Sequence, residues 1–170
     1  MSVFQDLINS GIQPPEQRDL RIENLKRIET ITGRPIVVYA ADWTTPLKQS
    51  TDNFIRYVSL DHNDALPFKE LIDPLQGNKL DVLVHSPGGL AEAAERVVKL
   101  LRGRFADVRF IVPHSSLSAA TMLCCSGNAI SMNEVSALGP IDPQINGIPA
   151  RAIKKGFERV RRAIGKTPGG

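Results

Sequence analysis

Apolar and polar residues follow two different periods along the chain, and the change from one to the other predicts strands followed by helices. Short β-branched runs at residues 35–41 (PIVVYAA), 80–86 (LDVLVHS) and 108–113 (VRFIVP) are bounded by turn residues, as is typical of buried strands. Apolar residues at helical spacing follow the second and third runs, from residue 91 to 101 and over SAATMLCCSG. We therefore expect an α/β fold of parallel βαβ units, with a mostly parallel sheet flanked by helices.

The two ends of the chain are more polar than its middle. A turn at Pro14 and Pro15 is followed by a charged helical segment that ends at Gly33, and a basic helix is predicted over residues 149–164. Shorter elements are predicted as helices over 52–60 and 67–75, a strand over 129–132 and a turn over 137–143. We expect one domain made of an N-terminal helical arm (1–34), an α/β core (35–148), and a C-terminal basic helix with a flexible-looking tail (149–170).

Length and composition place the chain among ordinary globular proteins. It has 170 residues, of which 42% are hydrophobic and 23% charged. It contains no run of about 18 apolar residues and no secretory signal pattern, so we expect a cytoplasmic protein without a membrane span. The adjacent Cys124 and Cys125 suit a core helix in a reducing compartment, and their spacing matches no metal site.

The formal net charge is +3, and much of the basic excess lies in the last predicted helix. We interpret that excess as a solvated helix face, because Glu158 interrupts it, and we expect no nucleic-acid partner.

Two predicted strand-to-helix turns have the composition of a catalytic site. The first reads HSPGGL from His85 and places Gly88 and Gly89 where free backbone amides can stabilise an oxyanion. The second reads HSSLSAA from His114 and places Ser118 at a helix start. Both turns follow parallel strands, so we expect them side by side at the carboxyl edge of the sheet.

Each turn also has a plain structural interpretation. Pro-Gly-Gly is common as a simple turn, and serine is a preferred helix N-cap. Ser86, Ser115 and Ser116 precede the helices, which makes capping the favoured role for them. Neither turn alone establishes catalysis.

The combination of SPGG, LSAAT and LGPIDPQ, which spans roughly residues 36–155, resembles the serine dehydrogenase proteinase family, a branch of the Clp-protease and crotonase superfamily. The resemblance implies a Clp/crotonase-like fold of repeated ββα units, with an oxyanion hole from the SPGG backbone and from the amide after the serine. It makes Ser118 the nucleophile, with Gly88 or Gly89 and Ala119 as oxyanion donors. One departure is Ala120, where the family usually has glycine.

The general base is the second departure. The Clp proteolytic subunit has a histidine in the turn that corresponds here to residues 138–143, and this chain has none there. Related proteases of this fold use a lysine, which implies Lys154 or Lys155, some 36 residues after the serine. His114 and His85 stand in the two turns and remain alternative bases.

We therefore expect a cytoplasmic serine peptidase or related hydrolase that acts on peptide or protein substrates, forms homo-oligomers and requires no metal or organic cofactor. One alternative is a crotonase-like enzyme that acts on acyl-thioesters, with Ser118 as a cap only. Another is a non-catalytic scaffold or truncated member of the family. A nucleotide-binding role is disfavoured because the chain lacks GxGxxG and P-loop motifs.

Overall fold

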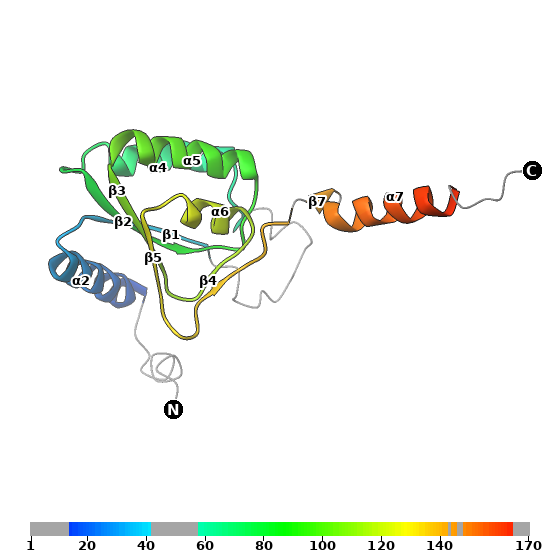
Figure 1. Cartoon of the computed structure of the whole chain (residues 1–170). Helices are drawn as coiled ribbons and strands as arrows, with labels where there is room; N and C mark the ends of the chain where they lie inside the picture. Colours follow the sequence, from blue (N-terminus) through cyan, green and yellow to red (C-terminus); the bar gives the residue numbers. More distant parts are fainter. Residues whose placement is uncertain (1–13, 42–57, 143, 146–147, 165–170) are drawn as a thin grey trace, which may run out of the picture.

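The centre of the molecule is a four-stranded parallel sheet with the strand order β1-β2-β3-β5 (Figure 1). A computed structural model describes residues 14–41, 58–142, 144–145 and 148–164. The strands of this sheet are β1 (Ile36–Ala40), β2 (Lys79–His85), β3 (Asp107–Val112) and β5 (Ala129–Met132). The mostly parallel sheet predicted from the β-branched runs is thus confirmed.

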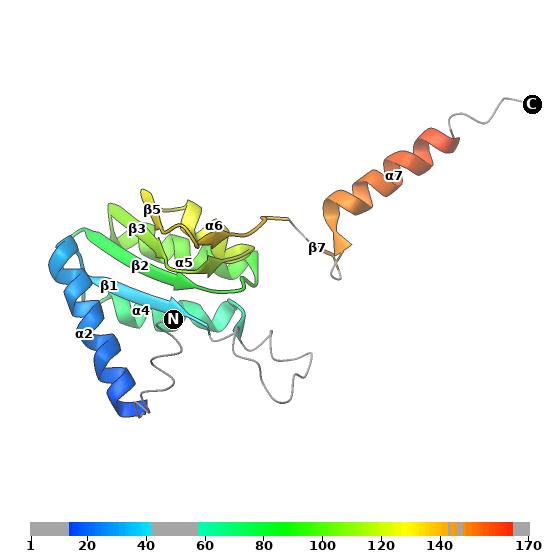
Figure 2. The same ribbon diagram turned by 90° about the horizontal axis from the view of Figure 1, so that it is seen from below.

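Helices cover the sheet unequally. They are α2 (Pro14–Thr32), α4 (Ala65–Ile72), α5 (Ala91–Arg104), α6 (Ala119–Cys125) and α7 (Ala150–Ile164), with a 3-10 turn, η1 (His62–Asp64), before α4. The helices α4 and α5 pack side by side over one face of the sheet, α6 packs against α5, and α2 contacts β1 (Figures 1 and 2).

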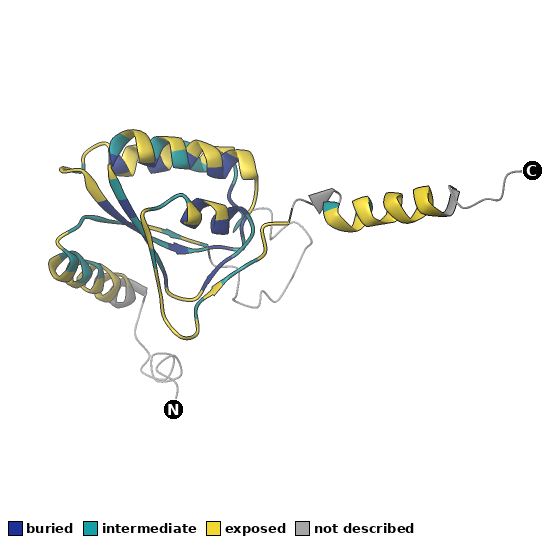
Figure 3. Ribbon diagram, viewed as in Figure 1, coloured by how far each residue is buried: buried dark blue, intermediate teal, exposed yellow. Residues whose placement is uncertain are grey.

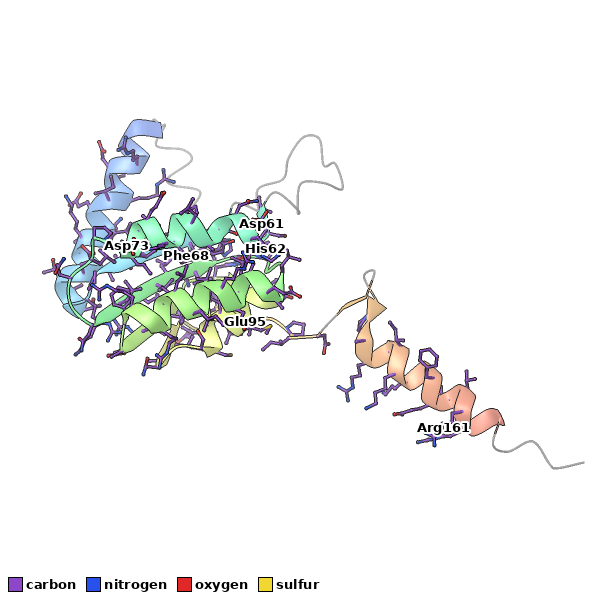
Figure 4. All side chains as sticks on the ribbon, turned by 90° about the horizontal axis from the view of Figure 1, so that it is seen from above. Asp61, His62, Phe68, Asp73, Glu95 and Arg161 are labelled. Carbon is purple, nitrogen blue, oxygen red and sulfur yellow. The ribbon has the colours of Figure 1, made fainter. Side chains whose placement is uncertain are left out.

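The core lies between the sheet and α4 and α5. Leu80, Val82 and Val84 lie on one face of β2, because successive strand residues point to opposite faces of a sheet. All three side chains are fully buried. Phe68 of α4 belongs to the same cluster, and Figure 4 shows its place on that helix. Only the inner sides of α4 and α5 are buried (Figure 3), as their amphipathic patterns predict.

An ion-pair network joins the strands near their amino ends. Asp81 is 0% exposed and pairs with Arg34 Nε at 2.7 Å and Arg109 Nη2 at 2.5 Å. Arg34 Nη1 also pairs with Asp107 Oδ2 at 2.7 Å. Because an unpaired buried carboxylate is costly, this network fixes the chain after α2 against β2 and β3.

Two local predictions differ from the structure, and a third is largely untested. Pro14 and Pro15 form the first residues of α2 rather than a separate turn, which is compatible with the missing amide of proline at a helix start. Within the predicted turn over 137–143, residues 137–138 form strand β6, which pairs in parallel with β4 (Ser115–Ser116). The predicted helix over 52–60 lies mostly outside the described residues.

The last helix stands apart from the rest of the described chain. It follows the small hairpin of β7 (Gln144–Ile145) and β8 (Ile148–Pro149), and both views show α7 projecting away from the sheet (Figures 1 and 2). No helix among the described residues is both long and apolar enough to cross a membrane.

Candidate active site

The two glycine- and serine-containing turns meet beyond the carboxyl edge of the sheet, as predicted. Ser86 and Ser116 form a parallel β-bridge. The Ser86 amide donates to the Ser115 carbonyl oxygen at 3.1 Å, and the Leu117 amide donates to the Ser86 carbonyl oxygen at 3.0 Å. These bonds hold the segment before Gly88 beside the segment before Ser118.

Gly88 packs directly against the serine turn. A Cβ atom at this buried position, where φ is 98°, would lie 2.5 Å from the Leu117 carbonyl oxygen and 2.7 Å from the Ser118 Cβ. The Gly88 amide donates to Ser86 Oγ at 3.1 Å, and the Leu60 amide donates to the Gly88 carbonyl oxygen at 2.7 Å. Glycine is therefore required by the close approach, and its amide already has an acceptor.

Gly89 differs from Gly88 in the hydrogen bonding of its backbone amide. The position has φ 152° and forms a bridge with the buried Leu60, whose carbonyl oxygen would lie 2.1 Å from an added Cβ. The Leu90 amide donates to that same Leu60 oxygen at 2.8 Å. Within the described ranges no acceptor is found for the Gly89 amide, so it is available to a ligand.

Ser118 adopts a strained backbone conformation. Its φ of 49° and ψ of −122° make it the one non-glycine residue with positive φ in the described part of the chain. Such conformations cost roughly 1–3 kcal/mol and persist where the surrounding structure enforces them, often at active sites. Although Ser118 occupies the N-cap position of α6, its side chain makes no capping hydrogen bond. The capping interpretation of this serine is therefore not supported.

The first turn of α6 leaves one amide unused. The Ala120 amide donates to Leu117 O at 3.0 Å, and the Thr121 and Met122 amides donate to Ser118 O at 2.9 and 3.2 Å. The Ala119 amide has no acceptor among the described residues, as expected at a helix start. Ala120, where the family usually has glycine, is buried in the core cluster.

Thr121 and Gly139 support the serine turn, a role that the motifs LSAAT and LGPIDPQ do not by themselves predict. Thr121 Oγ1 donates to the Ser116 carbonyl oxygen at 2.6 Å and accepts from the Gly139 amide at 3.2 Å. A Cβ on Gly139 would lie 2.7 Å from Leu117 Cδ2. Gly139, the glycine of LGPIDPQ, therefore packs against Leu117, the residue that precedes Ser118. No local sequence pattern predicts this contact.

The other serines of the two turns do not act as helix caps. Ser86 and Ser116 are fully buried in strand-like pairing, and Ser116 Oγ lies 3.3 Å from Cys124 Sγ. Burial raises the pKa of the Cys124 thiol to about 11, while the neighbouring Cys125 is exposed. Ser115 Oγ lies 2.8 Å from His114 Nδ1.

The candidate bases divide into two groups. The rings of His85 and His114 lie edge to face with centroids 5.4 Å apart, so the structure brings these two residues together. Lys154 and Lys155 are exposed on α7, which projects away from the site (Figures 1 and 3). In the described part of the chain, none of the four forms a hydrogen bond with Ser118.

One protein family matches most of the site-bearing chain. The match is to ClpP-like SDH-type serine proteinases and covers residues 57–165, more than half of the sequence. It includes both turns and α7.

Two proteins of Methanocaldococcus jannaschii are similar to part of the chain. The uncharacterized protein MJ0137 is 40% identical over 80 residues, which cover 47% of this chain and 28% of that protein. The uncharacterized protein MJ1495 is 34% identical over 80 residues, which cover 47% and 27%. The matched stretch thus spans little more than a quarter of the length of these relatives.

Two solved structures to which the chain is similar are described as proteases. A mutant of the 1510-N membrane-bound stomatin-specific protease is similar with a TM-score of 0.48 and 20% identity, over 58% of this chain and 54% of that chain. A mutant of ClpP1 from Listeria monocytogenes is similar with a TM-score of 0.39 and 17% identity, over 64% and 67%.

Proposed function

The chain belongs to the ClpP-like SDH-type serine proteinases, and from that premise we propose that it hydrolyses peptide bonds with Ser118 as the nucleophile. The observation that carries the proposal is the positive φ of Ser118 at the start of α6, with a side chain that makes no capping bond. A strained strand-to-helix turn presents a nucleophilic hydroxyl to a carbonyl carbon, as in other serine hydrolases.

The proposed oxyanion hole consists of the Gly89 and Ala119 amides. Gly88 is the weaker candidate of the two glycines, because its amide already donates to Ser86 Oγ. As Ser118 Oγ attacks, the carbonyl π electrons move to the oxygen, and donors fixed in place stabilise the resulting negative charge. The tetrahedral intermediate then expels the amine with a proton, and water hydrolyses the acyl-serine. None of these steps requires a metal or organic cofactor.

Hydrolysis assays on two substrate classes test the proposal. We expect the purified chain to degrade a fluorescently labelled unfolded protein such as casein, and we expect Ser118→Ala to abolish that activity. Ser115→Ala is the matched control, because this serine lies in the same turn and contacts His114 instead. Cleavage of an acyl-thioester that survives Ser118→Ala would instead identify a crotonase-like enzyme and reject the peptidase.

A further inference from the structure

The SPGG turn is held on one side by the backbone of Leu60. The Leu60 amide donates to the Gly88 carbonyl oxygen at 2.7 Å, and the Leu60 carbonyl oxygen accepts from the Leu90 amide at 2.8 Å. The position between these two bonds, Gly89, forms a parallel bridge with Leu60. The segment before η1 is therefore paired with the turn like a short strand, and whatever fixes Leu60 also fixes the turn.

The bond from Leu60 sets the direction of the proposed oxyanion donor, because the Gly88 carbonyl and the Gly89 amide belong to one peptide unit. A peptide unit is planar, and in its trans form the C=O and N–H bonds point in opposite directions. No cis peptide bond occurs within the described ranges. With the Gly88 carbonyl directed at Leu60, the Gly89 N–H is directed away from Leu60. A hydrogen bond to the carbonyl also polarises the peptide unit and makes its N–H a stronger donor.

Asp64 holds the segment that carries Leu60. Asp64 Oδ2 accepts from the amide of Asp61, the residue after Leu60, at 2.7 Å. The same oxygen accepts from the Tyr39 hydroxyl of β1 at 3.4 Å. Asp61 Oδ1 accepts in turn from the Asn63 amide at 2.7 Å, which completes a capping box around η1. One carboxylate thus ties the turn after Leu60 to the first strand of the sheet.

The surroundings of Asp64 and Tyr39 suit a lasting bond between them. Burial raises the pKa of the Tyr39 hydroxyl well above its usual range, so the phenol remains a hydrogen-bond donor at neutral pH. The Tyr39 ring also packs against Phe68 of α4, with ring centroids 5.4 Å apart. Asp64 directly precedes α4, but its side chain makes no capping bond to that helix. The carboxylate is therefore directed to Asp61 and Tyr39.

We propose that Asp64 is a positioning residue for the oxyanion hole: it holds Leu60, and Leu60 fixes the peptide unit whose N–H is the Gly89 donor. The inference rests on the proposed hydrolase function. Asp64 touches no substrate and acts through the backbone alone. Because the oxyanion exists only in the transition state and the tetrahedral intermediate, a misdirected Gly89 amide is expected to lower kcat and to leave KM nearly unchanged.

A cap without a catalytic consequence is the rival interpretation, because capping boxes are common at the starts of helices. The position of this box favours the proposal. Its first residue, Asp61, directly follows the residue that bonds Gly88. A cap alone would contribute to stability and leave the rate per folded molecule unchanged, so the two roles are separable by experiment.

Three variants grade the loss of the carboxylate bonds. Asp64→Ala removes both bonds and is expected to lower kcat on fluorescently labelled casein by about ten- to a hundredfold, with KM within about twofold of wild type. Asp64→Asn keeps an oxygen that accepts from the Asp61 amide and is expected to stay within about threefold of the wild-type kcat. Tyr39→Phe removes one bond and keeps the packed ring, so its kcat is expected to lie between these two variants.

Two further variants serve as controls. Asp73→Ala removes the carboxylate at the other end of α4, which pairs with the exposed Lys69, and Figure 4 shows Asp73 far along that helix from Asp61. It is expected to leave kcat and KM within about twofold of wild type. Asp81→Asn controls for lost stability, because it removes a buried carboxylate near the amino end of β2, away from the site. A cap-only Asp64 would behave like Asp81, with reduced stability and an unchanged kcat of the folded fraction.

Nuclear magnetic resonance observes the peptide unit itself and does not require activity. The sequence contains two Gly-Gly pairs, Gly88–Gly89 and Gly169–Gly170. When glycine is labelled with ¹³C at the carbonyl and with ¹⁵N, only these pairs give an amide–carbonyl correlation, and Gly170→Ala removes the second signal. In Asp64→Ala we expect the Gly88–Gly89 signal to shift or split, because its carbonyl is no longer held. The Asp73→Ala control is expected to leave this signal in place.

The two readouts together decide the inference. A displaced Gly88–Gly89 signal combined with a loss confined to kcat supports it. An Asp64→Ala variant with an unchanged signal overturns it, and so does one that keeps the wild-type kcat or loses activity only through KM. If Asp64→Ala does not fold, Tyr39→Phe is judged by the same criteria. A wild-type chain that neither hydrolyses casein nor labels with a fluorophosphonate probe rejects the hydrolase proposal, while the signal still decides whether Asp64 fixes the peptide unit.

Discussion

Gly88 lies so close to Ser118 that a methyl group on its Cα would approach the Ser118 Cβ to 2.7 Å. The backbone of the SPGG turn and the nucleophile turn therefore fit together as one unit. This contact is the structural basis for the first prediction.

Gly88→Ala is expected to reduce hydrolysis and probe labelling by at least about a hundredfold, because the methyl group displaces Ser118 from the oxyanion donors. Gly77→Ala is the matched control, since Gly77 also has positive φ but nothing lies within 4 Å of an added Cβ. This control measures the effect of backbone strain alone, which is expected to lower the unfolding free energy by about 1 kcal/mol. Steady-state rates and thermal unfolding measure both effects. A fully active Gly88→Ala variant would contradict the contact.

Thr121→Val is expected to lower the unfolding free energy by about 1–3 kcal/mol and to slow probe labelling. The variant keeps the side-chain shape but removes the hydroxyl that bonds Ser116 O and the Gly139 amide, leaving buried polar groups unpaired. Thr121→Ser retains the hydroxyl and is expected to stay close to wild type. Urea unfolding combined with labelling rates checks the prediction, and equal behaviour of the Val and Ser variants would refute it.

Asp81→Asn is expected to destabilise the fold by about 3–5 kcal/mol, because Arg34 and Arg109 lose the buried carboxylate that they share. The labelling rate of the folded fraction is expected to be unchanged, since Asp81 lies near the amino end of β2 and the site lies beyond its carboxyl end. Asp73→Asn breaks only the exposed pair with Lys69 and is expected to cost less than about 1 kcal/mol. A larger cost for Asp73→Asn than for Asp81→Asn would reject this account of stability.

The two cysteines are expected to react differently with a thiol reagent at mild alkaline pH. Cys125 is exposed and reacts in the folded protein, whereas Cys124 is buried and reacts only on unfolding. Titration with dithionitrobenzoate, with and without denaturant, counts the exposed and the buried thiols. Two rapidly reacting thiols in the native protein would contradict the packing of α6.

The raised pKa of Cys124 also predicts a loss of stability at high pH. The unfolded chain releases this proton near pH 9, but the folded chain keeps it until about pH 11, where burial holds the pKa of the thiol. Between these values the unfolded state binds fewer protons, so the unfolding free energy falls as pH rises, by up to about 2–3 kcal/mol. Cys124→Ala is expected to flatten this part of the stability profile, and an unchanged slope would contradict it.

The sequence predicts the sheet and its flanking helices well, because their patterns are local. The buried run around Val82 and the helical spacing from Ala94 to Leu101 each identify an element without knowledge of its neighbours. The meeting of Gly88 with Ser118 is also predictable, since both follow neighbouring parallel strands.

The features that the sequence does not predict depend on contacts between distant segments. The pairing of β6 with β4 and the bond between Thr121 and Gly139 join residues with no periodic signal. The positive φ of Ser118 is imposed by its surroundings rather than by its residue type. The projection of α7 away from the sheet is likewise not predicted by local spacing.

The most direct test of the account is the location of a fluorophosphonate adduct on the purified chain, determined by peptide mass spectrometry beside Ser118→Ala. The account predicts one adduct, on Ser118, that is absent from the variant. An adduct on Ser115 or Ser116, or a folded and assembled wild-type protein that forms none, would contradict the claim that Ser118 is an activated nucleophile.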